Sequence, residues 1–270
     1  MSQNLVQTNQ IIKVQTDKKL IGFYDKLKKA PIERYAQIHA KGDVINGKRT
    51  NSLIGISLQD YSNGTGKNNR IVQFNLEPEQ IQFLLTRVEA GWQEFEWSAD
   101  KIFGEPNAGG YSTAQKIVIN RHPLRKDGSP STSPWFISIS NGKGIRLQNK
   151  TGGFYMKGGS YVQESNVYIN LTDMDMYKLL KRTDTFIKNW EKLVADQILL
   201  QGQESYAAVV ANLKNQNNQP QYQPYQSNPQ PQPQYQPYQP EPQTAFQPYA
   251  PVYNGEPYSQ FSTNNPYQNY

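Results

Sequence analysis

Residues 72–87, VQFNLEPEQIQFLLTR, and residues 167–182, VYINLTDMDMYKLLKR, follow one pattern at a constant offset of 95 positions. Aligned without gaps, the two stretches share Val, Asn-Leu, Leu-Leu and Arg. Each begins with an alternating run typical of a strand and continues with an apolar stripe at helical spacing. The pattern predicts one strand-to-helix unit used twice, with the Leu-Leu pair packing each helix onto a sheet. The agreement has two explanations: internal duplication, or chance, because many proteins contain strand-to-helix units of this kind.

Start and stop signals frame both predicted helices. Residues 77–79 place a proline and acids in the first turn of the first helix, where a missing N–H does no harm and negative charge is favourable. Gly91 can end this helix. Thr172 is a candidate N-cap for the second helix. We expect the second helix to run, with a break near Gly202, to about Leu213.

Strand-like runs surround the two units. The runs at 52–61 and 70–76 flank a Gly/Asn-rich loop, as the two strands of a hairpin do. The fold class predicted is α+β: antiparallel sheets with two strand-to-helix repeats, followed by a C-terminal tail. The expected strands are 34–40, 52–61, 70–76, 95–98, 115–121, 135–140, 144–147, 154–157 and 166–171.

The N-terminal segment and the tail complete the expected organisation. The first dozen residues look like a loose arm. Leu20, Phe23, Tyr24 and Leu27 then fall at helical spacing in a basic segment, which predicts a short basic helix that Pro31 ends. The expected divisions are an arm and basic helix over 1–30, an α+β domain over 31–214, and a tail over 215–270.

The tail is of low complexity. Residues 221–225, QYQPY, recur as residues 234–238. Frequent prolines remove backbone donors, and aliphatic side chains are too few to offset the chain entropy of folding. The composition therefore predicts a disordered Gln/Pro/Tyr-rich tail. Its tyrosines are expected to make weak contacts for self-association or with protein partners.

Composition narrows the class of protein. The chain has no cysteine and two histidines, so disulfides and thiolate metal sites are excluded, and we expect no metal and no cofactor. Residues 1–214 carry 28 basic and 20 acidic side chains, a net charge of +8, which favours a polyanionic partner. No apolar stretch reaches signal-peptide or membrane-spanning length. The expected location is the cytoplasm of a bacterial or phage-infected cell, without membrane contact.

The most informative stretch for chemistry is 114–161. It holds eight basic side chains against one acid, Asp127, with aromatics between them. Single-strand binders combine cations that follow phosphates with flat side chains that stack on bases. The same aromatics could instead be core residues, and one of Trp135 and Phe136 should be buried. The predicted nucleic-acid-binding residues are Lys116, Arg121, Arg125, Lys126, Trp135, Lys143, Arg146, Tyr155 and Lys157.

Motifs of catalysis are missing from the sequence. The pairs Gly64–Gly66 and Gly142–Gly144 do not belong to a complete dinucleotide or phosphate-loop fingerprint. There is no Gly-x-Ser-x-Gly elbow and no metal-ligand spacing. We therefore expect a protein that is not an enzyme.

The element order over residues 32–195 resembles the Whirly-type fold and the related single-strand-binding domain of eukaryotic transcriptional positive cofactors. That resemblance implies single-stranded nucleic acid held along sheet surfaces, in a dimer or a larger ring. The Whirly signature Lys-Gly-Lys-Ala-Ala is absent; residues 40–43, AKGD, come nearest, so no family residue is carried over. The tail is similar to those of bacterial single-strand-binding proteins. Their OB-fold barrel, here with added helices, is the structural alternative.

Together these features favour a single-stranded DNA-binding protein that acts without catalysis in replication, recombination or transfer. RNA stays possible, because the distinction depends on contacts to the 2′-hydroxyl. A homo-oligomer is expected from the resemblance. The alternatives are a structural or assembly protein with a self-associating tail, and a transcription regulator that binds duplex DNA.

Overall fold

The computed structural model describes residues 8–64 and 66–217. Within these ranges no helix is both long and apolar enough to cross a membrane. The elements are β1 Gln10–Gln15, β2 Lys19–Lys26, η1 Ile32–Gln37, β3 Lys41–Ile45, β4 Lys48–Asn51, β5 Leu53–Asp60, η2 Gly66–Asn68, β6 Arg70–Leu76, α1 Pro78–Glu89, β7 Phe95–Phe103, β8 Ser112–Arg121, β9 Trp135–Gly144, β10 Arg146–Gln148, β11 Phe154–Met156, β12 Val162–Leu171 and α2 Asp173–Asn217.

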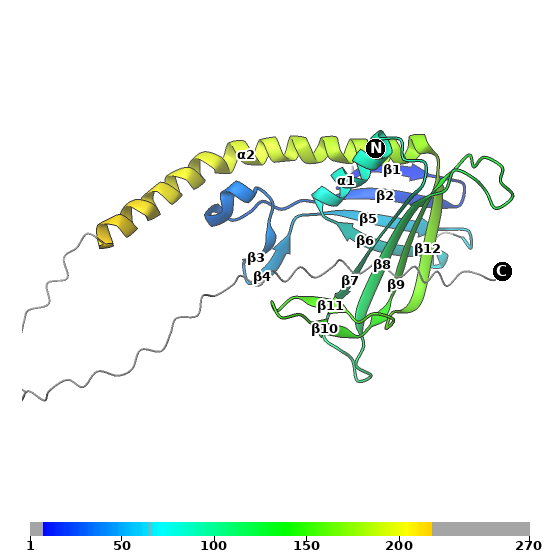
Figure 1. Ribbon diagram of the computed structural model, residues 1–270, viewed down its shortest axis with the longest axis horizontal. Coiled ribbons are helices and arrows are strands. Elements are labelled where there is room, and N and C mark those ends of the chain that lie inside the picture. Colours follow the sequence, from blue (N-terminus) through cyan, green and yellow to red (C-terminus); the bar gives the residue numbers. More distant parts are fainter. Residues whose placement is uncertain (1–7, 65, 218–270) are drawn as a thin grey trace, which may run out of the picture. The chain divides into compact units, whose positions relative to one another are not determined.

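Each half of the chain builds an antiparallel sheet and then a helix. In the first half, β1, β2, β5 and β6 pair in chain order, and α1 follows β6. In the second half, β7, β8, β9 and β12 pair in chain order, and α2 follows β12. The hairpin β3–β4 is inserted into the first sheet's connections and β10–β11 into the second's (Figure 1). The predicted α+β class with two strand-to-helix repeats is confirmed.

The two units agree at the level of side chains. Leu84 and Leu85 of α1 are buried, as are Leu179 and Leu180 of α2. The strands that precede the helices match in the same way. Positions 72, 74 and 76 of β6 are buried, and so are the equivalent positions 167, 169 and 171 of β12. The helices also contact each other. Equivalent apolar positions therefore pack a helix against its sheet in both halves.

One apolar core lies between the sheets. In the first sheet Ile56 of β5 faces Phe74 of β6, and in the second Ile137 of β9 faces Ile169 of β12; all four are buried. The strands of the second sheet run across those of the first (Figure 1). The described strands thus form two four-stranded open sheets and two two-stranded hairpins, and not the closed barrel of the OB-fold alternative.

The N-terminal prediction needs correction. Residues 10–15 and 19–26 form β1 and β2, and β2 pairs with β5 along its whole length, so no basic helix forms there. Ile21 and Phe23 alternate inward with Gly22 between them, a strand pattern that the coincidental helical spacing obscured. Sheet pairing decides such ambiguous runs. These residues belong to the first sheet and not to a separate arm.

A second correction concerns residues 34–40 and the end of α2. Residues 32–37 form the short 3₁₀ helix η1 and not a strand. Its Tyr35 packs against Gly202, where any Cβ would overlap the tyrosine ring. The glycine serves close approach of η1, and α2 continues through it to Asn217 without the expected break. The tail from residue 218 lies outside the described residues.

Gly202→Ala is therefore expected to destabilise the protein by about 1–3 kcal/mol through overpacking, although alanine is the better helix former by about 1 kcal/mol. Urea unfolding of the full chain measures the effect. In a Tyr35→Ala background the overlap is gone, so the same change should be neutral or stabilising. Equal destabilisation in both backgrounds would contradict the assignment.

Candidate nucleic-acid interface

The outward face of the second sheet presents an aromatic pair. The strand alternation that buries Ile137 and Ile169 turns Phe136 and Tyr168 to the other side. Their rings stack, with centroids 5.5 Å apart and planes 30° from parallel. Tyr168 is 45% exposed. A flat, accessible ring surface of this kind is what an unpaired base requires for stacking.

A lysine from the first sheet completes this pair. The ammonium of Lys19, at the start of β2, lies 3.4 Å from the centroid of the Tyr168 ring. A cation over an aromatic face is favourable and places positive charge next to the stacking surface. Outward polar side chains surround the pair: Asn120, Ser138, Asn166 and Asn170. None of these residues is among those predicted from the sequence, although the alternation along β9 and β12 indicates that Phe136 and Tyr168 face away from the core.

The inserted β10–β11 hairpin closes one end of this face. The Tyr161 hydroxyl, just after the hairpin, donates to Oγ of Ser140 on β9 at 2.7 Å, and burial raises the pKa of Tyr161. Met156 packs over Gly144, which has no side chain to block it. These contacts fasten the hairpin to the strand ends, so that it walls the aromatic face at the lower end of the sheet in Figure 1.

Three of the predicted residues lie on or beside this hairpin, namely Arg146, Tyr155 and Lys157, whereas Lys143 belongs to β9 and shares the row of Ile137 and Ile139. Arg146 donates to Glu105 at 2.9 Å and covers the ring of Phe154 at 4.3 Å. Lys143 pairs with Glu164 at 3.5 Å. Lys157 is exposed, and so is Tyr155, which lies across from Leu147 on the hairpin.

The loop 122–134 lies at the opposite end of β9. Arg125 and Lys126 are exposed at its tip, which is organised by a Leu124–Pro130 bridge. Asp127 accepts bonds from the hydroxyl and the N–H of Ser129, and these bonds lower its pKa. The loop is an ordered basic turn, so cations flank the aromatic face at both ends.

Charge on the face itself is mixed. Lys116 points outward from β8 opposite Asp100 and Ser140. Of the eight basic side chains at 114–161, five form no ion pair with any residue the structure describes: Lys116, Arg125, Lys126, Lys150 and Lys157. Their charges remain available to phosphates.

Two predicted residues have structural roles instead. Trp135 is 2% exposed, and its indole N–H donates to Asp173 at 2.8 Å. Arg121 donates to both carboxylate oxygens of Asp173, at 2.9 and 3.1 Å, and to the carbonyl of Gln93. Trp135 cannot stack on a base in this arrangement, so the prediction was wrong for this residue. In the structure Arg121 of β8 and Trp135 of β9 both join their strands to the first turn of α2.

The hydrogen bond from Arg121, with that from Trp135, lowers the pKa of Asp173. A depressed carboxyl pKa adds stability above its unfolded value, about 3.9, and loses it as pH falls through the folded value. We expect Asp173→Asn to be less stable than wild type at pH 7, with a difference that shrinks below about pH 4. Urea unfolding across pH tests this, and a constant difference would contradict it.

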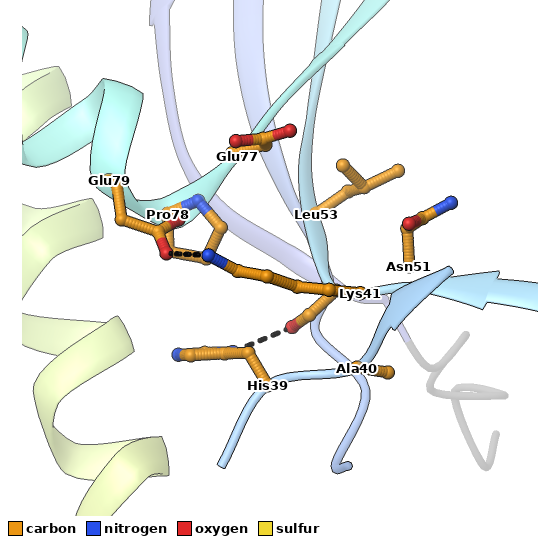
Figure 2. Close-up of a pocket in the computed structure, with 9 residues that line it drawn as sticks. His39, Ala40, Lys41, Asn51, Leu53, Glu77, Pro78 and Glu79 are labelled. Carbon is orange, nitrogen blue, oxygen red and sulfur yellow. Dashed lines mark hydrogen bonds and ion pairs between the residues drawn. The ribbon is translucent and has the colours of Figure 1, made fainter. Parts of the chain in front are cut away.

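Near the start of α1, a small pocket holds the buried His39 (Figure 2). Its ring lies 2.8 Å from Ser52 Oγ and 3.1 Å from Glu191 Oε1, and it stacks on Trp190. The order serine, histidine, glutamate matches the connectivity of an acyl-transfer triad. Ser52, however, is 4% exposed, and its oxygen already accepts the N–H of Lys28. The cluster fastens α2 to the first half and does not present a nucleophile.

The charged side chains at the rim of the same pocket pair with each other. Lys41 donates to Glu79 at 2.7 Å across the opening (Figure 2). This contact raises the pKa of Lys41. Among the described residues no group of three or more potential metal ligands occurs. The pocket therefore offers neither an activated base nor a binding cavity of substrate size.

No family model and no curated protein matches the sequence. Among solved structures, the plant transcriptional regulator PBF-2 is 14% identical, with 73% of this chain and 85% of that chain covered and a TM-score of 0.35. WHY3 from Arabidopsis thaliana is 15% identical, with 75% and 95% covered and a TM-score of 0.36. WHY1 from Arabidopsis thaliana is 14% identical, with 77% of this chain and 96% of that chain covered and a TM-score of 0.35. These matches are Whirly proteins, the type that the sequence resembles.

Proposed function

We propose that this protein binds single-stranded DNA, without catalysis, on the outward face of its second sheet. The observation that carries the proposal is the Phe136–Tyr168 stack, in which Phe136 is half-buried and Tyr168 exposed, beneath the ammonium of Lys19. A base would take the place of the Lys19 ammonium over the Tyr168 ring, which leaves Lys19 to meet a phosphate, and other phosphates would meet the unpaired cations at both ends of the face. Stacking of this kind tolerates any base, so we expect weak sequence preference.

An open sheet suits a flexible single strand better than a duplex. Duplex readers commonly insert a helix into the major groove. Here the apolar faces of α1 and α2 are buried in the core, through residues such as Ile81 and Leu179. The duplex-binding alternative therefore has less support. Competition with oligo-U tests DNA against RNA, because the bases differ little and the 2′-hydroxyl differs most.

The biological setting is part of the proposal. Coating or holding a single strand is needed in replication, recombination or transfer, in the cytoplasm of a bacterial or phage-infected cell. The nucleic-acid-binding domain would comprise the two sheets and their helices, up to about residue 214. The tail, from 215 on, would recruit protein partners or promote self-association through its tyrosines.

Self-association is also proposed through the end of α2. The stripe that packs Ile198 and Gly202 onto the body continues as Tyr206, Val209 and Leu213, which are exposed. Residues 205–213 carry no charge, so a second copy could lie along this stripe without repulsion. Sedimentation should show an oligomer that Val209→Glu with Leu213→Glu dissociates. A monomeric wild type would contradict this part of the proposal.

Tyr168→Ala is expected to weaken oligo-dT binding about tenfold, since one base-stacking contact contributes roughly 1–3 kcal/mol. Fluorescence anisotropy of the full chain measures this. Tyr177→Ala is the matched control, because Tyr177 is 37% exposed on α2, away from the sheet face. Equal losses in both variants would show that the ring of Tyr168 has no specific role.

A further inference from the structure

The outward face of the first sheet has an unusual side-chain composition. The acids of its strands, Asp25 and Asp60, occupy the inward rows, where Asp25 faces Ile54. In the described strands the outward side chains are therefore free of negative charge. They are Gln10, Lys13, Gln15, Leu20, Tyr24, Lys26, Leu53, Ser57, Gln59, Ile71, Gln73 and Asn75, with Gly22 and Gly55 between them.

Two glycines hold side chains flat on this face. A Cβ at Gly22 would lie 2.8 Å from the hydroxyl and 2.9 Å from a ring carbon of Tyr24. A Cβ at Gly55, directly opposite Tyr24, would lie 2.8 Å from Cε of Lys26. Any side chain at either position would displace the residue above it. The ring of Tyr24 therefore lies along the sheet, with its other face available.

Two ammonium groups converge on Asn75 of β6, whose partner Gly55 lies opposite Tyr24, and that of Lys101 also lies 5.1 Å from the centroid of the inward Phe74 ring. Lys26 donates to the side-chain oxygen of Asn75 at 2.9 Å, and Lys101 from β7 donates to its backbone oxygen at 2.5 Å. Neither lysine forms an ion pair with a described residue. Burial, and then the charge of Lys26, lower the pKa of Lys101, while Glu77 opposes this shift. Like charges held together by a neutral partner are stabilised by a bound anion.

We propose that Tyr24, Lys26 and Lys101 form a second nucleotide-binding site, with a base on the Tyr24 ring and its phosphate at the two lysines. The occupant is a nucleotide of the same single-stranded nucleic acid, so the inference rests on the proposed function. A sheet face whose strands carry no outward acid, with an aromatic platform and two cations at Asn75, matches the stacking and charge that a single strand presents. The protein then has a strand contact on each sheet.

Photo-crosslinking locates both contacts independently. The full chain is irradiated with oligo-dT of about 40 nucleotides, long enough for two sites of up to about 16 nucleotides each, with 5-iodo-dU replacing some thymines. Adducts are mapped by mass spectrometry. We expect adducts at Tyr24 and on the Phe136–Tyr168 pair. Tyr24→Ala with Lys26→Gln should remove the first adduct, retain the second, and weaken affinity for the long oligonucleotide about tenfold.

Two conservative variants show whether a loss of binding comes from the lost contacts or from misfolding of the double variant. Tyr24→Phe keeps the ring and should bind as the wild type does, and Lys26→Gln alone keeps a donor to Asn75 while removing charge. Lys48→Gln on the exposed β3–β4 hairpin is the control for lost charge. Unchanged affinity in the double variant, with adducts at Tyr168 and none at Tyr24, would overturn this inference and leave the proposed function intact. Absence of any binding by the wild type would refute both.

Discussion

Lys116→Glu combined with Lys157→Glu is expected to weaken oligo-dT binding by well over tenfold at low salt. Both lysines are exposed and lack an ion pair with any described residue, so their charges are free to neutralise phosphates. Each lost phosphate contact on a single strand should reduce the slope of log K against log salt by about 0.7. The pair should therefore lower this slope by roughly 1.4. Anisotropy titrations at several salt concentrations measure affinity and slope together.

The control must alter net charge equally while leaving the face intact. Lys178→Glu with Lys192→Glu does so, because both side chains are exposed on α2. We expect this variant to bind nearly as the wild type does. If the two double variants lost affinity and slope equally, general charge rather than the sheet face would govern binding.

Trp135→Ala is expected to lower the free energy of unfolding by about 3–5 kcal/mol, the range for a buried aromatic reduced to alanine. The ring fills the core beneath the start of α2, and its N–H binds Asp173. Urea unfolding measures the loss. Trp135→Phe keeps most of the volume and should cost less, about 1.5–3 kcal/mol for the lost bond to a charged group.

This prediction separates a core residue from an interface residue. Tyr168→Ala should reduce binding while leaving unfolding nearly unchanged, because the ring is largely exposed. Trp135→Phe should do the reverse, provided binding is measured where the variant is folded. A Trp135→Phe variant that is fully stable but does not bind would contradict the buried role of Trp135.

The repeat at 72–87 and 167–182 was predictable because local signals and packing agree there. Strand alternation, helix capping and the Leu-Leu pairs all indicate the same unit. Thr172, for example, accepts the N–H of Asp175 as an N-cap should. Where local and tertiary signals conflict, the sequence is ambiguous. Leu20, Phe23 and Leu27 fit a helix equally well until β5 is available as a partner.

The candidate site was predictable as a region and less so by residue. The basic, aromatic composition of 114–161 identifies the second sheet and its hairpin. Which aromatic is buried depends on strand register and on distant partners such as Asp173, which no local pattern reveals. Lys19 lies almost 150 positions from Tyr168, and only the packing of two sheets brings them together.

The central claim is tested most directly by fluorescence anisotropy of labelled oligo-dT with the full chain, over a salt series and with duplex competitor. We expect binding that weakens steeply as salt rises and that excess duplex does not displace. Failure to bind at low salt, or ready displacement by duplex, would contradict it.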